Sequence, residues 1–152
     1  MIFNRFKNTQ VELIDDNTLK VISTMTDTYH EIIVTLKVNI SDSNIIEASA
    51  QFLRQPDVMC KETAKFIEKL VGVSLGRGIT KNAIALIGGT SGCTHIVDMV
   101  LESAKAFVQG KFTKQFNDIG DREKAIGFIN KQLEGTCWYH ARHQREAAKE
   151  QE

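Results

Sequence analysis

The pattern of apolar and polar positions changes character about one third of the way along the chain. Between residues 10 and 53, apolar residues alternate with polar ones, which is the period of a half-buried β-strand. The apolar positions form runs at residues 11–13, 19–21, 32–40 and 45–52. Turn-forming residues at 15–17 and 41–44 separate neighbouring runs by lengths typical of hairpins. This part of the chain therefore predicts an antiparallel meander of three or four strands.

After Pro56, apolar residues recur at the spacing of one helix face. A helix over residues 58–71 is predicted, with Asp57 as its N-cap and Gly72 closing it. Three more helices are predicted at residues 80–87, 96–108 and 121–133. We expect Gly110 to stop the third helix, and the fourth to bury Ala125, Phe128, Ile129 and Leu133. Strands followed by helices indicate an α+β fold with about four helices packed on one face of the sheet.

The chain has 152 residues, a length typical of one domain with a sizeable core. We expect a single α+β domain over residues 1–139 and a polar C-terminal tail over residues 140–152, because the sequence after Trp138 becomes polar and charged. Nineteen basic residues balance nineteen acidic ones, which gives no electrostatic reason to expect nucleic acid as a partner.

The remaining global features favour a cytoplasmic protein. No apolar run approaches the roughly 20 residues that span a bilayer, so no membrane partner is expected. The first residues lack the apolar core of a signal peptide. The three cysteines Cys60, Cys93 and Cys137 are an odd number at wide spacing, unlike a secreted disulfide framework.

The most informative segment is Gly88-Gly89-Thr90-Ser91-Gly92-Cys93-Thr94-His95. It is a glycine-rich turn that places a cysteine and a histidine at the start of the third predicted helix. Unpaired N–H groups and the helix dipole favour negative charge there, which favours the thiolate form of a cysteine. A thiolate is either a metal ligand or a nucleophile, and the segment alone leaves both open.

Metal binding draws on residues that lie at the ends of predicted elements. A tetrahedral zinc site takes about four nitrogen or sulfur ligands. His30 lies where a strand begins, and Cys60 and Cys93 each lie where a helix begins. Asp27 and Glu31 flank His30 and are candidates to orient its ring. The full set of predicted metal ligands is His30, Cys60, Cys93, Cys137 and His95; His140 and His143 are the remaining histidines.

Several of these segments resemble a bacterial family called domain of unknown function 2889. They are Asp27-Thr28-Tyr29-His30-Glu31, Leu70-Val71-Gly72-Val73, Gly92-Cys93-Thr94-His95-Ile96, Gln109 and Cys137. The resemblance covers about residues 17–139, and its most specific element is Gly-Cys-Thr-His. The family's name implies no activity.

A second and more distant resemblance is to iron–sulfur scaffold proteins of the IscU/NifU type. It rests on the order Lys37-Val38-Asn39, Ile45-Ile46-Glu47-Ala48, then Cys60 and Cys93 each opening a helix. The resemblance implies an IscU-like fold, in which the family's second and third metal-binding cysteines fall on Cys60 and Cys93. The first falls near residues 28–30, where this chain offers His30.

Three functions are compatible with these features, and the sequence favours the first, a protein that is not an enzyme. The first is a non-enzymatic module that binds Zn, Fe or an Fe–S cluster through His30, Cys60 and Cys93, with His95 or Cys137. The second is a thiol enzyme in which Cys93 is the nucleophile, His95 or His30 is the base and backbone N–H groups of residues 88–93 form an oxyanion hole. The third is an adaptor that binds a protein partner or forms a homo-oligomer and holds no metal.

Overall fold

The computed structural model describes residues 1–142, and those residues fall into two compact units. The first unit is Met1–Lys111 and the second begins at Phe112. Residues 143–152, most of the expected polar tail, lie outside the described part, as does His143. No helix among the described residues is long and apolar enough to cross a membrane.

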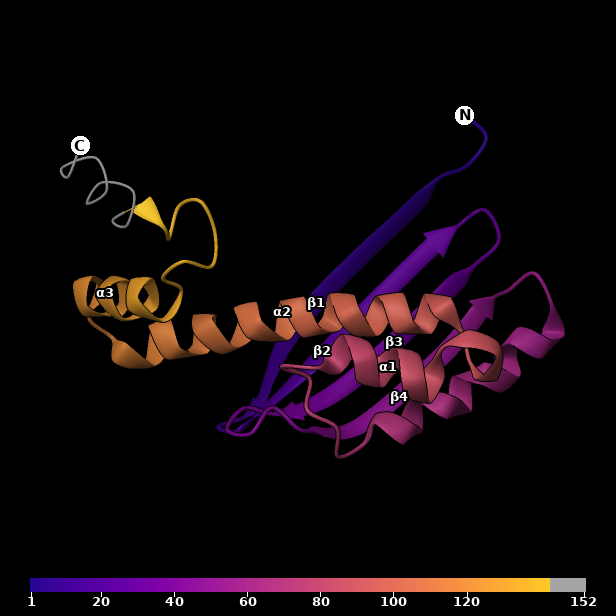
Figure 1. Cartoon of the computed structure of the whole chain (residues 1–152), viewed down its shortest axis with the longest axis horizontal. Coiled ribbons are helices and arrows are strands. Elements are labelled where there is room, and N and C mark those ends of the chain that lie inside the picture. Colours follow the sequence, from indigo (N-terminus) through magenta and orange to yellow (C-terminus); the bar gives the residue numbers. More distant parts are fainter. Residues whose placement is uncertain (143–152) are drawn as a thin grey trace. The chain divides into compact units, whose positions relative to one another are not determined.

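The first unit is built on a four-stranded sheet, which confirms the predicted meander (Figure 1). Every neighbouring pair is antiparallel, in the order β1-β2-β3-β4. The strands are β1 (Arg5–Asp15), β2 (Thr18–Asp27), β3 (Glu31–Asn39) and β4 (Ile45–Arg54). In β2 and β3, burial alternates at every residue, as expected for a sheet with one face against a core.

Helical segments cover that face (Figure 1). They are the 3₁₀ helices η1 (Val58–Leu70) and η2 (Gly89–Ser91) and the α-helices α1 (Ile79–Ile87) and α2 (Thr94–Ile119). The core joins sheet residues such as Val34 to Leu70 of η1, Ala83 of α1 and Phe107 of α2. The α+β class predicted from the sequence is therefore confirmed. Asp57 caps η1 as expected, because its Oδ1 accepts a hydrogen bond from the Met59 N–H.

Gly110 does not stop the third predicted helix, so this prediction is wrong. Helix α2 continues to Ile119 and ends before Gly120, which has a φ of 70°. A Cβ atom on Gly110 would lie 2.6 Å from Val11 Cγ1 and 3.4 Å from Leu19 Cδ1. Gly110 is therefore the residue that lets α2 approach β1 and β2 closely, and its lack of a side chain serves packing.

The second unit contains α3 (Arg122–Gln132), close to the fourth predicted helix. Asp121 caps this helix by accepting a hydrogen bond from the Lys124 N–H at 2.9 Å. Ala125 is fully buried as predicted, whereas Phe128 is 37% exposed. The expected burial of Phe128 is therefore wrong.

The polar segment Arg5–Gln10 belongs to β1, although the sequence pattern placed the first strand from residue 11. Polar partners explain why the helix-facing positions Arg5, Lys7 and Thr9 are not apolar. On this side of β1, Arg5 contacts Asp27 and Lys7 pairs with Asp98 of α2. Thr9 Oγ1 lies 2.9 Å from Ser23 Oγ, which lies 2.8 Å from Ser103 Oγ.

Candidate functional site: a Cys–His–His–Asp cluster

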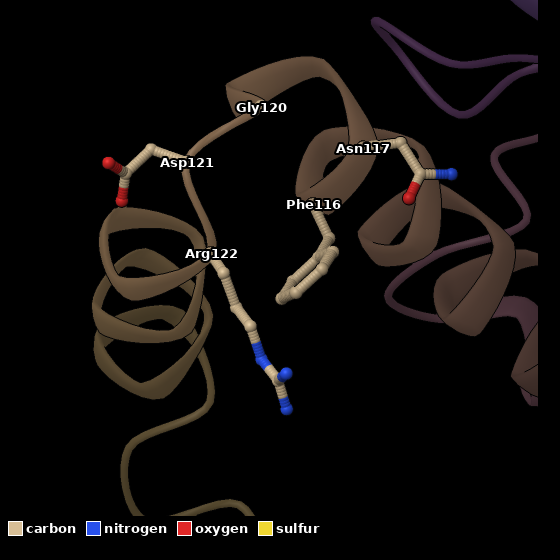
Figure 2. Close-up of a pocket in the computed structure, with 5 residues that line it drawn as sticks. All are labelled: Phe116, Asn117, Gly120, Asp121 and Arg122. Carbon is tan, nitrogen blue, oxygen red and sulfur yellow. The ribbon is translucent and has the colours of Figure 1, made fainter.

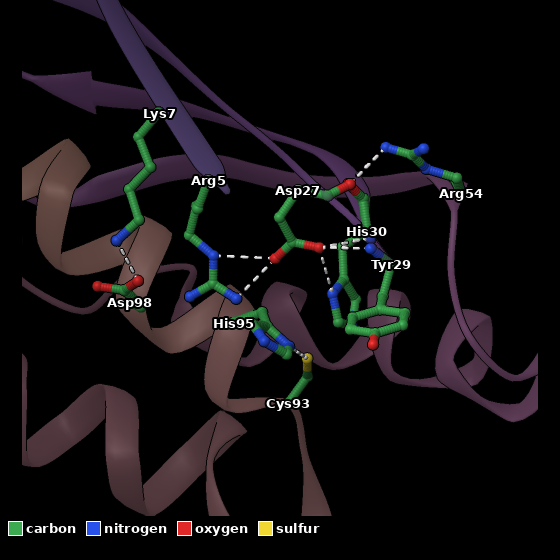
Figure 3. Close-up of polar contacts among 9 residues, drawn as sticks. All are labelled: Arg5, Lys7, Asp27, Tyr29, His30, Arg54, Cys93, His95 and Asp98. Atoms are coloured by element: carbon green, nitrogen blue, oxygen red, sulfur yellow. Dashed lines mark hydrogen bonds and ion pairs between the residues drawn. The ribbon is translucent and has the colours of Figure 1, made fainter. Parts of the chain in front are cut away.

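The site lies where the β2–β3 turn meets the start of α2, within the first unit (Figure 3). Asp27 ends β2 and His30 precedes β3, while Cys93 and His95 lie at the N-terminal end of α2. Figure 3 shows these side chains converging from the two segments.

Asp27 is the centre of the site's hydrogen bonds. Its side chain is fully buried and its two oxygens accept hydrogen bonds on opposite sides. Oδ2 accepts from Arg5 Nε at 2.9 Å and Nη2 at 2.6 Å, so two charged donors share one carboxylate oxygen. Oδ1 accepts from the backbone N–H groups of Tyr29 and His30 at 2.8 and 2.7 Å, and contacts His30 Nδ1 at 3.0 Å.

These contacts keep Asp27 ionised. Burial alone would raise the pKa of the Asp27 carboxyl, but hydrogen bonds from Tyr29, Arg5 and His30 outweigh burial and hold the pKa well below its usual value. An ionised carboxylate only accepts hydrogen bonds, so the proton between the two side chains belongs to His30 Nδ1. In neutral His30, Nε2 is then the nitrogen with a free lone pair.

His30 and His95 form a pair of neighbouring imidazoles. Their ring centroids are 4.1 Å apart and their planes are inclined by 43°. Burial lowers the pKa of His95, and the nearby His30 and Arg5 lower it further. Asp27 and Asp98 act in the opposite direction without reversing the shift. The site therefore favours a neutral His95, which is the form that accepts a proton or binds a metal.

Cys93 Sγ lies 3.9 Å from His95 Nδ1, within reach of a weak S–H to N hydrogen bond. Their separation by two residues would place them on different faces of a regular helix. Cys93 instead precedes the regular part of α2, although its carbonyl accepts the hydrogen bond from Val97 N–H. The two side chains can therefore face each other despite the two-residue separation.

Gly92 fixes the position of Cys93. A Cβ atom on Gly92 would lie 1.9 Å from the Ile87 carbonyl oxygen, a distance that no side chain tolerates. That close approach lets the Cys93 N–H donate to the same oxygen at 2.9 Å. The loop is thereby tied to the last residue of α1, and Cys93 is presented at the start of α2.

The N–H groups expected to form an oxyanion hole are partly engaged. Gly88 N–H donates to the Ile84 carbonyl at 3.1 Å and Cys93 N–H donates to Ile87. These two groups are therefore not available to a substrate, contrary to the prediction for residues 88–93. The first-turn N–H groups of α2 lack acceptors within the helix and lie directly after Cys93.

The other predicted metal ligands belong to other segments of the chain. Cys60 is half-buried in η1 against the core, and Cys137 is exposed in the second unit. His140 is also in the second unit, where its ring contacts Tyr139. Across residues 1–142, no three or more His, Cys, Asp or Glu side chains are grouped so that they could hold a metal ion.

Arg5 and Arg54 are parts of the site that the sequence pattern missed. Arg54 Nη2 donates to the Asp27 carbonyl at 2.6 Å and to the His30 carbonyl at 3.3 Å. An aspartate side chain that accepts hydrogen bonds from the backbone N–H groups two and three residues later is typical of a turn. The segment Asp27-Thr28-Tyr29-His30 has this pattern. Neither arginine lies near this turn in sequence, so no local signal identifies either one.

A pocket elsewhere contains none of the predicted site residues. It has a volume of about 450 Å³ and is lined by Phe116, Asn117, Gly120, Asp121 and Arg122 (Figure 2). Phe116 and Arg122 project into the angle between the end of α2 and the start of α3. The Asp121 carboxylate is already engaged as the N-cap of α3.

Fold and site together define an α+β protein with a cysteine, two histidines and an ionised aspartate in one cluster. Residues 6–109 match the model of a family described as protein of unknown function (DUF2889). This match covers more than half of the chain, so the chain belongs to that family. No curated protein and no solved structure matches the chain significantly. These comparisons give no support to the IscU/NifU resemblance.

Proposed function

We propose that this protein is a thiol enzyme that transfers acyl groups, with Cys93 as its nucleophile and His95 as its base. The observation that carries the proposal is the 3.9 Å contact between Cys93 Sγ and His95 Nδ1 at the N-terminal end of α2. Nucleophile and base within reach of each other, with the base oriented by a third group, is the arrangement that nucleophilic catalysis requires.

In the proposed reaction, Cys93 Sγ attacks the carbonyl carbon of an ester or thioester and its proton passes to His95 Nδ1. The S–C bond forms, the bond to the leaving group breaks, and His95 gives the proton to the leaving group. Water then cleaves the acyl-cysteine, with His95 taking the water's proton and returning one to Sγ. The first-turn N–H groups of α2 would stabilise the oxyanion in both steps.

His30 and Asp27 support His95 in this scheme. The His30 ring lies against His95, and Asp27 fixes that ring through Nδ1. When His95 takes the proton, the buried Asp27 carboxylate stabilises the imidazolium by its charge. Arg5 holds Asp27 in the ionised form that this role needs.

An acylation experiment tests this proposal. The full chain is incubated with an activated acetyl ester, and the acetylated residue is located by peptide mass spectrometry. We expect acetylation at Cys93 with a burst of released alcohol, loss of both in Cys93→Ser, and a slower burst in His95→Gln. Cys137→Ser is the matched control and should behave like the wild type. Acetylation spread over lysines, and equal in Cys93→Ser, would contradict the proposal and favour the adaptor function.

Metal binding is the second candidate, since two imidazoles and a thiol lie in one cluster and His95 favours its neutral form. In this case the side chains of His30, His95 and Cys93 rearrange to bind Zn or Fe, because among residues 1–142 no such group is placed to hold a metal ion as it stands. Metal analysis of protein purified without oxygen tests this candidate. It predicts one Zn or Fe per chain that His30→Ala removes, and a metal-free wild type that still reacts at Cys93 would contradict it.

A further inference from the structure

The turn that carries His30 is closed from within by three hydrogen bonds. Asp27 N–H donates to the His30 carbonyl at 2.8 Å. The N–H groups of Tyr29 and His30 donate to Asp27 Oδ1. These contacts define the shape of the turn but do not connect it to the neighbouring strand β4.

Arg54 supplies that connection. It lies at the end of β4, where it pairs with Glu31, and the register shifts between Glu31 and Ile32. Its Nη2 donates to the carbonyls of Asp27 and His30, at 2.6 and 3.3 Å. The guanidinium thus bridges the first and last residues of the turn from outside (Figure 3).

We infer that Arg54 is a positioning residue for the Cys93 site. It touches neither Cys93 nor His95 in Figure 3, and it acts by holding the two carbonyls that set where the His30 ring lies against His95. A planar, charged fork suits this task better than an ammonium group, since lysine offers a single point of charge on a flexible stem. The effect on Cys93 rests on the proposed function, whereas the effect on His30 does not.

The side chain is well suited to a test because Arg54 is exposed. Its removal leaves no cavity in the core, so the variant is expected to fold. Arg54→Ala removes both contacts and Arg54→Lys retains the charge. Arg77→Ala, at an exposed arginine in the turn before α1, is the matched control.

Two measurements on the full chain separate the positioning role from the chemistry. Proton–nitrogen NMR of the imidazoles should show neutral His30 protonated at Nδ1 in the wild type and a mixture of tautomers in Arg54→Ala. The rate of Cys93 alkylation by iodoacetamide at pH 7 should fall about three- to tenfold in Arg54→Ala, roughly the loss expected for one hydrogen-bonded contact. Arg54→Lys should lie between the two, and Arg77→Ala should match the wild type.

An unchanged His30 tautomer in both Arg54 variants would overturn the inference. A changed tautomer with an unchanged Cys93 rate would also overturn it, provided that His95→Gln does slow Cys93. If His95→Gln leaves the Cys93 rate unchanged, the proposed enzyme function fails, and the tautomer change alone then decides whether Arg54 positions His30. Should Arg54→Ala fail to fold, Arg54→Lys carries both measurements.

Discussion

At the scale of single residues, Asp27 links the β2–β3 turn to β1, because its two oxygens accept hydrogen bonds from the turn and from Arg5. Asp27→Asn leaves Arg5 without its anionic partner and replaces an acceptor by an amide. We expect a loss on the order of 3 kcal/mol in the free energy of unfolding, measured with urea at pH 7. Asp16→Asn, at an exposed position between β1 and β2, is the control and should change stability by less than about 0.5 kcal/mol.

The pH dependence of Asp27 follows from its lowered pKa. Its contribution to stability is present above the usual carboxyl pKa of about 4 and is lost as the pH falls below that value. Wild-type protein should therefore lose more stability than Asp27→Asn does between about pH 4 and pH 2. Equal losses in the two proteins would contradict the role given to this ion pair.

The lowered pKa of His95 predicts a second loss of stability, which occurs at a higher pH than the loss from Asp27. The pKa of His95 is lowered in the folded protein, so below the unfolded value of about 6.5 the unfolded chain binds more protons. The contribution of neutral His95 to the free energy of unfolding should be fully present above pH 6.5 and should decrease as the pH falls below that value. Urea titrations between pH 7.5 and 5 should show a smaller decrease in His95→Gln than in the wild type. Parallel curves for the two proteins would show that folding does not lower the pKa of His95.

Some of this site was predictable from the sequence and some was not. His30, Cys93 and His95 stand out because their types carry chemistry and because they lie at the ends of elements. The contact between Cys93 and His95 was not predictable, because it depends on Cys93 lying before the regular part of α2 and on the space left by Gly92. Arg54 reaches the turn across the β3–β4 pairing, which no local pattern encodes.

At the scale of elements, the strands were predictable where one face meets an apolar core. The period-two pattern of β2 and β3 follows directly from that contact. The first half of β1 was missed because its helix-facing side pairs with polar groups: Lys7 contacts Asp98 and Thr9 contacts Ser23. A pattern of apolar residues cannot report such an interface.

Gly110 offers a test of how closely α2 packs against β1. In a helix, alanine is ordinarily about 1 kcal/mol more favourable than glycine. A Cβ at Gly110 would instead meet Val11 at 2.6 Å, so we expect Gly110→Ala to destabilise the protein by about 1–3 kcal/mol in urea unfolding.

A control for this prediction lies in α3. A Cβ on Gly127 would meet nothing within 4 Å, so Gly127→Ala should slow amide hydrogen exchange in α3. Val11→Ala combined with Gly110→Ala should recover part of the lost stability. A more stable Gly110→Ala protein would show that α2 and β1 are not in close contact there.

At the scale of the whole molecule, the family match and the first compact unit nearly coincide. The family model covers residues 6–109 and the first unit ends at Lys111. All residues of the Cys–His–His–Asp cluster lie within both. The sequence did not indicate a change of unit at this place, because α2 continues across it without a break.

This coincidence predicts the behaviour of a shortened chain that ends at Gly120, the residue that terminates α2. The core of the sheet and the cluster both lie within the first unit. The shortened chain should therefore retain the β-sheet signal in its far-ultraviolet circular dichroism spectrum and the alkylation rate of Cys93. Loss of the cooperative unfolding transition in urea would show that the second unit is needed for the first to fold.

The alkylation rates of the individual cysteines test whether His95 activates Cys93. Wild type and His95→Gln are treated with limiting iodoacetamide at pH 7, and each cysteine is quantified by mass spectrometry. Cys137, which is exposed, provides the internal reference. We expect half-buried Cys93 to react faster than Cys137 in the wild type, and His95→Gln to slow Cys93 about tenfold or more without changing Cys137. A Cys93 that reacts more slowly than Cys137, at the same rate in both proteins, would contradict this role of His95.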